Sequence, residues 1–290
     1  MTHVHRSPRL DAARRALTAL VVLATCAFQA HAQSPVLSDE VPFITTPDNV
    51  TLEMLQAARV GATDHVIDLG SGDGRIVIVA AKRFGATGLG VEIVPDLVEK
   101  SLRTAREVGV ADKVTFKVQD LFQTDLSRAT VITMYLLPEF NLKLRPALLA
   151  LKPGTRIVSH DWDMGDWKPD QTTVVPVPDK KVGLEKSSKV HLWTVPARID
   201  GLWCGSGPLG DFSLKVTQRY QEVEATLTRG DRARAIQGRM TGAVLRTQST
   251  RHGSLELTQE GAQLRVTGGD GTLSMARGIA FQRARGAGCS

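Results

Sequence analysis

The stretch from His65 to Ala81 constrains the fold of this chain more than any other. It opens with a short apolar run that ends at the carboxylate of Asp68, a pattern typical of a buried parallel strand. Three glycines alternate through the turn that follows: Gly70, Gly72 and Gly74. Residues 75–84 then predict a helix. Ligands of open α/β sheets bind where such a strand ends, because glycines let them approach the backbone and free N–H groups point outward.

The spacing of the glycines indicates which ligand this turn binds. A dinucleotide fingerprint, G-x-G-x-x-G, would need a third glycine where the chain has Arg75. Instead one acid, Asp68, precedes the glycines and another, Asp73, lies among them. Two carboxylates would repel a pyrophosphate but suit a ligand with a cationic centre and a free amine. The pattern resembles motif I of the class I (seven-β-strand) S-adenosylmethionine-dependent methyltransferases.

Two more acids follow the next two predicted strands. Glu92 lies near the end of the strand over residues 88–93, 24 residues beyond Asp68, which is about the interval for an acid that accepts hydrogen bonds from ribose hydroxyls. Asp120 follows the strand over residues 114–118 and is expected to accept from the adenine amino group, with Leu121 or Phe122 covering the ring. Cofactor binding is therefore assigned to six residues: Asp68, Gly70, Gly72, Asp73, Glu92 and Asp120.

The remaining patterns up to residue 197 complete an α/β domain. Further helices are expected over residues 46–59, 95–107 and 141–149, and further strands over 129–134 and 155–160, with an antiparallel pair over 174–177 and 190–195. The expected fold is a Rossmann-like sheet of seven strands with helices on both faces. Thr46 is expected to cap the first helix, with Pro47 at its first position.

Three side chains beyond the fourth and fifth strands are candidates to orient a methyl acceptor. Tyr135 follows the fourth strand, and Asp161 and Asp163 follow the fifth. A lysine acceptor has an ordinary pKa of about 10.4 and must lose a proton before it attacks the methyl group. His160 with Asp161 and Asp163 could also suggest a metal site, but one histidine with scattered acids is a weak pattern, and no metal is expected.

Residues 41–170 resemble one branch of these methyltransferases, the small mitochondrial lysine methyltransferases that modify the ATP synthase c-subunit and adenine nucleotide translocase, with their bacterial relatives. The resemblance is carried by Val41-Pro42-Phe43, residues 68–75, Asp120-Leu121 and residues 153–159, and residues 135–138 and 161–167 are similar to the bacterial members. It implies S-adenosylmethionine as cofactor and a protein lysine as acceptor. A small-molecule methyltransferase and a non-catalytic envelope protein that retains the fold remain alternatives.

The last 93 residues have a different composition. Residues 198–290 contain short alternating runs separated by turn signals, which predicts a small antiparallel barrel or sandwich. The predicted strands cover residues 213–217, 223–227, 235–236, 244–247, 255–258, 264–267 and 279–282. They carry 13 lysines and arginines against 8 acids, a net charge of +5, whereas residues 33–197 carry 19 against 21, a net of −2. The near-neutral first domain argues against nucleic-acid binding. The basic second domain suggests contact with the cell envelope or a membrane surface.

The N-terminus predicts export. Residues 1–32 combine basic residues, an apolar run and the small-x-small sequence Ala30-His31-Ala32, as in a cleaved signal peptide. An uncleaved membrane tether is the alternative, and Arg14-Arg15 is a partial twin-arginine signal. The expected protein is exported, either periplasmic or membrane-tethered, with a methyltransferase domain at 33–197 and a β domain at 198–290. In such a compartment Cys204 and Cys289 are expected to pair, the alternative being two free thiols.

Overall fold

The computed structural model describes residues 44–290 except 182, 184, 208–209, 287 and 290. All of these described residues belong to a single unit of the chain. The predicted signal peptide, residues 1–32, lies outside the described residues. Within the described part of the chain, no helix is both long enough and apolar enough to cross a membrane.

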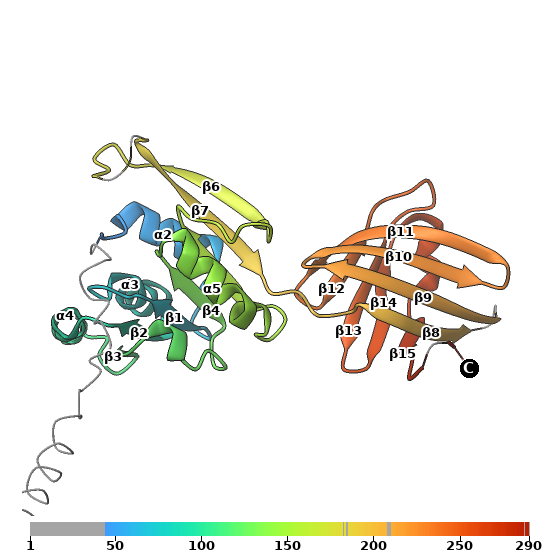
Figure 1. The fold of residues 1–290 in the computed structure, drawn as a ribbon, viewed down its shortest axis with the longest axis horizontal. Coiled ribbons are helices and arrows are strands. Elements are labelled where there is room, and N and C mark those ends of the chain that lie inside the picture. Colours follow the sequence, from blue (N-terminus) through green and yellow to red (C-terminus); the bar gives the residue numbers. More distant parts are fainter. Residues whose placement is uncertain (1–43, 182, 184, 208–209, 287, 290) are drawn as a thin grey trace, which may run out of the picture. The chain divides into compact units, whose positions relative to one another are not determined.

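The first half of the described chain folds into the predicted seven-stranded sheet (Figure 1). Its strands are β1 (His65–Leu69), β2 (Thr87–Glu92), β3 (Val114–Val118), β4 (Val131–Met134), β5 (Arg156–His160), β6 (Gln171–Pro176) and β7 (Ser187–Thr194). Their order is β3-β2-β1-β4-β5-β7-β6, with β7 antiparallel to both of its neighbours. Because β1 to β5 run parallel, their carboxyl ends meet at one edge of the sheet.

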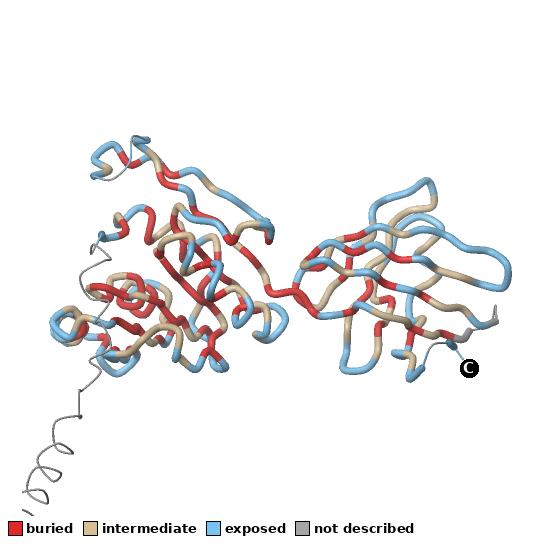
Figure 2. The backbone as a smooth tube through the Cα atoms, viewed as in Figure 1, coloured by how far each residue is buried: buried red, intermediate tan, exposed pale blue. Residues whose placement is uncertain are grey.

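Helices cover both faces of this sheet, as predicted. They are α2 (Asp48–Ala57), α3 (Arg75–Phe84), α4 (Pro95–Glu107) and α5 (Pro138–Leu149), with a 3₁₀ turn, η2 (Leu121–Gln123). Alternate residues of β1 and β4 point to opposite faces: Val66 and Val131 pack in one cluster with α2 and α3, and Ile67 and Ile132 pack in another with α5. Figure 2 shows the resulting buried layer along the central strands.

The start of α2 differs from the prediction. The helix begins at Asp48 with Pro47 as its N-cap residue, and no side chain caps it. The side chain of Thr46 instead forms a hydrogen bond with Nδ1 of His160 at 3.1 Å. The Thr46 hydroxyl therefore bonds His160, 114 residues away in the chain, and does not cap α2 as the local sequence pattern predicts.

The second half of the described chain forms a closed antiparallel barrel, so of the two predicted β architectures the barrel is confirmed. Its eight strands are β8 (Gly201–Gly207), β9 (Gly210–Arg219), β10 (Glu222–Arg229), β11 (Arg232–Thr241), β12 (Val244–Thr247), β13 (Leu255–Glu260), β14 (Gln263–Gly269) and β15 (Ala280–Arg283), and a 3₁₀ segment, η3 (Gly271–Ala276), precedes the last. The sequence patterns missed β8.

The barrel has a hydrophobic core of its own and one disulfide bond. Trp203 on β8 and Met240 on β11 are fully buried within it. Trp203 also donates from its indole nitrogen to the carbonyl oxygen of Ile199 at 2.7 Å, so that its polar atom is satisfied. Cys204 and Cys289 are bonded, which joins the first strand of the barrel to the chain beyond its last strand. The expected pairing is therefore present.

Candidate functional site

The glycine turn after β1 is held against the next strand by its own backbone. The N–H groups of Gly70 and Ser71 both donate to the carbonyl oxygen of Val91 on β2, at 3.0 and 2.9 Å. Gly74 has a φ of +75°, and a Cβ atom there would lie 2.6 Å from the Phe116 ring. Only glycine fits this position, where the chain enters α3 without any side-chain cap. The first N–H groups of α3 therefore face the same edge of the sheet as the turn.

Asp68 lies beneath this turn as a buried carboxyl group. It is 2% exposed, and its Oδ1 accepts a hydrogen bond from the hydroxyl of Thr133 on β4 at 2.7 Å. Burial raises the pKa of Asp68 to about 7, and the charges of Glu92 and Asp73 contribute to the rise against the effect of the Thr133 hydrogen bond. A buried carboxyl with so high a pKa would be stabilised in its charged form by a ligand ammonium group.

Glu92 closes the site from the end of β2. Its Oε2 accepts from the N–H of Gly72 at 2.9 Å, and its Oε1 accepts from the N–H groups of Ile93 and Val94 at 2.8 and 3.0 Å. The carboxylate thus joins the glycine turn to the end of β2. Oε1 thus accepts two hydrogen bonds, whereas Oε2 accepts one and has a further lone pair to which a hydroxyl group of a ligand can donate.

The other two predicted cofactor acids are engaged by local partners. Asp73 receives two hydrogen bonds from the guanidinium of Arg75, at 2.9 and 2.8 Å. Burial acts to raise the pKa of Asp73, but the hydrogen bonds and charge of Arg75 outweigh it, so the pKa lies below its ordinary value. Asp120 caps η2 through the N–H of Phe122 at 2.9 Å. The predicted cofactor residues thus lie at, or just beyond, the carboxyl ends of β1 to β3.

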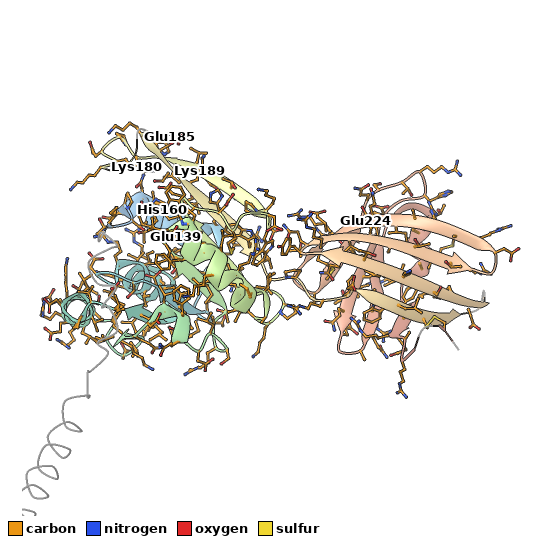
Figure 3. All side chains as sticks on the ribbon, viewed as in Figure 1. Glu139, His160, Lys180, Glu185, Lys189 and Glu224 are labelled. Atoms are coloured by element: carbon orange, nitrogen blue, oxygen red, sulfur yellow. A yellow bond between two sulfur atoms is a disulfide. The ribbon has the colours of Figure 1, made fainter. Side chains whose placement is uncertain are left out.

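A second cluster lies at the ends of β4 and β5. The ring of Tyr135 stacks on that of His160, with centroids 3.9 Å apart. His160, which Figure 3 labels, is 1% exposed, and its Nε2 forms a hydrogen bond with the hydroxyl of Ser188 at 2.9 Å. Burial lowers the pKa of His160 well below its ordinary value, although the charge of Asp161 opposes this. The imidazole is therefore neutral at pH 7.

Asp161 is the carboxylate of this cluster. It adopts a left-handed backbone conformation, with a φ of +61°, which is uncommon for a residue other than glycine and often accompanies function. Its Oδ2 accepts from the ammonium group of Lys180 at 2.8 Å, and its Oδ1 accepts from the N–H of Lys189 at 2.9 Å. Burial acts to raise the pKa of Asp161, but these two hydrogen bonds, together with the charges of His160 and Lys180, outweigh burial and hold the pKa below its ordinary value. Burial and the Asp161 charge raise the pKa of the Tyr135 hydroxyl.

Two of the three predicted acceptor-side residues therefore come together, and one does not. Tyr135 and Asp161 share a cluster around His160. Asp163 is exposed and accepts from the N–H of Gly165 at 3.0 Å, within its own turn. Thr133 and Lys180 were missed, because nothing local in the sequence shows that they face a carboxylate 65 and 19 residues away. The described residues contain no group of three or more side chains arranged to hold a metal ion.

The residues of the first cluster fit S-adenosylmethionine. The ligand has an amine and a sulfonium, for which buried Asp68 supplies negative charge, and ribose hydroxyls, for one of which Oε2 of Glu92 supplies an acceptor. The hydroxyl of Ser71, inside the glycine turn, is buried without a hydrogen-bond partner among the described residues. An unpaired buried polar atom at this position is suited to a polar ligand.

Comparisons with known proteins agree with this geometry. The family model described as the ANTKMT methyltransferase domain matches residues 68–171. A protein-lysine N-methyltransferase of Saccharolobus islandicus is 42% identical over 137 residues, which cover 47% of this chain and 85% of that protein. The human lysine N-methyltransferase of the ATP synthase c-subunit is 33% identical over 46% of this chain and 55% of its own length.

A solved structure is also similar in sequence. It is that of an RNA methyltransferase from Salinibacter ruber in complex with S-adenosyl-L-homocysteine, with 53% identity over 54% of this chain and 96% of that chain and a TM-score of 0.48. The Saccharolobus islandicus enzyme, which is matched over 85% of its length, is sufficient to establish the family. The chain belongs to the ANTKMT methyltransferase family and is an S-adenosylmethionine-dependent enzyme.

Proposed function

We propose that this enzyme methylates the ε-amino group of lysine in a protein. The observation that carries the proposal is the cluster of Tyr135, His160 and Asp161, which brings a hydroxyl and a carboxylate to the acceptor edge of the sheet. In the structure this carboxylate already binds a lysine ammonium group, that of Lys180. The two relatives described above are named as lysine N-methyltransferases, which supports the same acceptor.

The chemistry asks little of the protein beyond binding and orientation. The cofactor supplies a methyl group activated by its sulfonium. Asp68 would hold the cationic end of the bound cofactor, and Glu92, which also accepts from the N–H of Gly72, would accept from a ribose hydroxyl. Asp161 attracts the acceptor ammonium, and the Tyr135 hydroxyl orients the amine once its proton has left to water. Such positioning accounts for much of the acceleration in reactions between two bound groups.

His160 contributes to this arrangement without exchanging protons at neutral pH. Its ring stacks on that of Tyr135, and both of its nitrogens form hydrogen bonds, with the hydroxyl groups of Thr46 and Ser188. Because its pKa is lowered by burial, it remains neutral and adds no positive charge that would repel an incoming ammonium group. We therefore assign it as a positioning residue for Tyr135.

The compartment in which the enzyme works is also part of the proposal. A disulfide between Cys204 and Cys289 favours an oxidising environment, and the sequence of residues 1–32 has the pattern of an export signal. Together they support a periplasmic or membrane-tethered enzyme that is exported with its cofactor or draws on a supply at the membrane.

The acceptor class can be tested by labelling. The purified enzyme is incubated with S-adenosylmethionine carrying a deuterated methyl group and with envelope proteins, total RNA or small-molecule extract in separate reactions. The proposal expects label on lysines of proteins. Label confined to RNA or to small molecules, under conditions where the enzyme binds its cofactor, would contradict it.

The acceptor-side assignment has a matched pair of variants. Asp161→Asn removes the carboxylate of the cluster and should lower kcat/KM for the protein acceptor by about a hundredfold, because misplacement of a bound reactant has that order of effect. Asp163→Asn makes the same chemical change two residues away, outside the cluster, and should leave kcat/KM unchanged. Equal losses in the two variants would show that Asp161 has no specific role.

A further inference from the structure

The barrel wall has an opening between β11 and β12. β10 pairs with β11 along the whole of β10, from Glu222 to Arg229. β12, in contrast, pairs with β11 only from Gly238 to Thr241. Residues 232–237 of β11 therefore have no strand partner on the β12 side, apart from one hydrogen bond from the N–H of Gln248 to the carbonyl oxygen of Gln237. A cavity of about 280 Å³ lies at this opening.

The cavity is lined mainly by apolar side chains that the barrel core leaves half-buried. These are Leu227, Ile236, Leu255 and Leu273. The first three alternate along their strands with outward-facing residues, so they continue the inner face that Ala225 and Leu257 occupy deeper in the barrel. An eight-stranded barrel has room for either its own side chains or one small ligand. Here side chains fill the deeper part of the barrel, and the cavity lies at its end. The size and lining suit a short length of hydrocarbon chain.

Five exposed arginines lie on segments next to the cavity-lining residues in the chain, and we name them the arginine rim. Its members lie on the β10–β11 turn and the start of β11, on the β12–β13 connection and just after η3: Arg229, Arg232, Arg234, Arg251 and Arg277. Arg234 also lines the cavity itself. The acids nearest to them in the chain are Asp231, Glu256 and Asp270. Asp270 is already bound by the N–H and hydroxyl of Ser254, and Glu256 pairs with Arg246.

The rim arginines lack the acidic partners that four other arginines of the barrel have, namely Arg219, Arg239, Arg246 and Arg265. Elsewhere Arg246 pairs with Glu256 at 2.8 Å and Arg265 pairs with Glu260 at 3.3 Å, each on a neighbouring strand or turn. No rim arginine forms an ion pair with a carboxylate of the described residues. Unpaired charge gathered around an apolar opening is complementary to a molecule with an anionic head and a hydrocarbon tail.

We propose that this end of the barrel binds an anionic membrane lipid, with one acyl chain in the cavity and the phosphate group against the arginine rim. A single apolar insertion holds a protein at a membrane only marginally, and a basic patch adjoining it converts this into stable attachment. The site would hold the enzyme at an anionic membrane surface. It lies in the barrel and is independent of the methyl-transfer site.

The test measures sedimentation of the chain from residue 33 onward, which retains the whole compact unit, with lipid vesicles. Phosphatidylcholine vesicles are compared with vesicles that also contain phosphatidylglycerol. Binding is expected to the second kind and not to the first. Each arginine near an anionic surface contributes about a fivefold gain in affinity, so Arg232→Gln with Arg234→Gln should weaken binding about 25-fold. Glycerol phosphate, which has the head group without a chain, should not displace the protein from the vesicles.

Two controls separate a built site from general charge attraction. Arg246→Gln with Arg265→Gln removes the same charge from paired arginines and should weaken binding much less than the rim variant. Ile236→Trp fills the cavity without changing charge and should also weaken binding, with circular dichroism verifying that the barrel is folded. Equal losses in the two double variants, full binding by Ile236→Trp, or release by glycerol phosphate would each overturn the proposal.

Discussion

Replacing Asp68 by asparagine should stabilise the cofactor-free protein at alkaline pH while weakening its binding of the cofactor. Asparagine keeps the size of the side chain and an oxygen that accepts from Thr133, but it carries no charge. The folded protein keeps the proton on Asp68 up to about pH 7, whereas the unfolded chain loses it near the ordinary value of 3.8. Stability from this residue is therefore present below about pH 4 and is lost as pH rises to about 7.

The magnitude follows from the two pKa values. A rise from 3.8 to about 7 corresponds to about 4 kcal/mol, at 1.36 kcal/mol for each pH unit. Asp68→Asn should therefore match the parent protein at pH 4 and exceed it by up to about 4 kcal/mol at pH 8. The assay is the free energy of unfolding in urea across this range, followed by a signal from the sheet domain.

A second carboxyl provides a control of opposite sign. Asp64 is also buried, but its pKa is lowered: burial acts to raise it, and hydrogen bonds from Arg156, Thr130 and the N–H of Gly61 outweigh burial. Asp64→Asn should destabilise the protein at pH 7, and this loss should shrink as pH falls below about 4. An advantage of Asp68→Asn that does not change with pH would refute the reasoning.

Two further predictions concern the barrel and the glycine turn. Replacing both Cys204 and Cys289 by serine opens a link between residues 85 positions apart and should cost about 4 to 5 kcal/mol of unfolding free energy, measured for the barrel by calorimetry; an unchanged melting temperature would contradict this. Gly74→Ala should lower the free energy of unfolding by about 2 to 4 kcal/mol, because the left-handed backbone and the nearby Phe116 ring both oppose a methyl group. Gly109 has the same φ of +75° but open space around it, so Gly109→Ala should cost only about 1 to 2 kcal/mol. Equal losses of unfolding free energy in the two glycine variants would show that the contact with Phe116 is unimportant.

The sheet could be predicted because its signals are local. Each strand is a short apolar run, and parallel pairing then places Asp68, Glu92 and Asp120 at one edge whatever the details of packing. The same holds for the alternating runs of the barrel. β8 escaped prediction because its described residues, which include Gly201, Trp203 and Cys204, show no clear alternation of polar and apolar side chains.

The contacts of individual side chains could not be predicted in the same way. Asp73 accepts hydrogen bonds from Arg75, and Asp120 accepts one from the N–H of Phe122. In both cases a donor two residues away binds a carboxylate that the sequence analysis assigned to the cofactor. Lys180 reaches Asp161 from the connection between β6 and β7, a contact that depends on how that hairpin packs. Sequence spacing places such residues at the right edge, and only the folded structure decides which partner each one takes.

Calorimetric titration of S-adenosylmethionine into the parent protein and into Asp68→Asn tests the central claim most directly. We expect one binding site in the parent, with proton release near pH 7 as Asp68 becomes charged against the ligand amine. The variant should bind about ten- to hundredfold more weakly, since it loses a hydrogen bond to a charged group. No binding by a folded parent protein, or equal affinity and no proton release in both proteins, would contradict the account of this site.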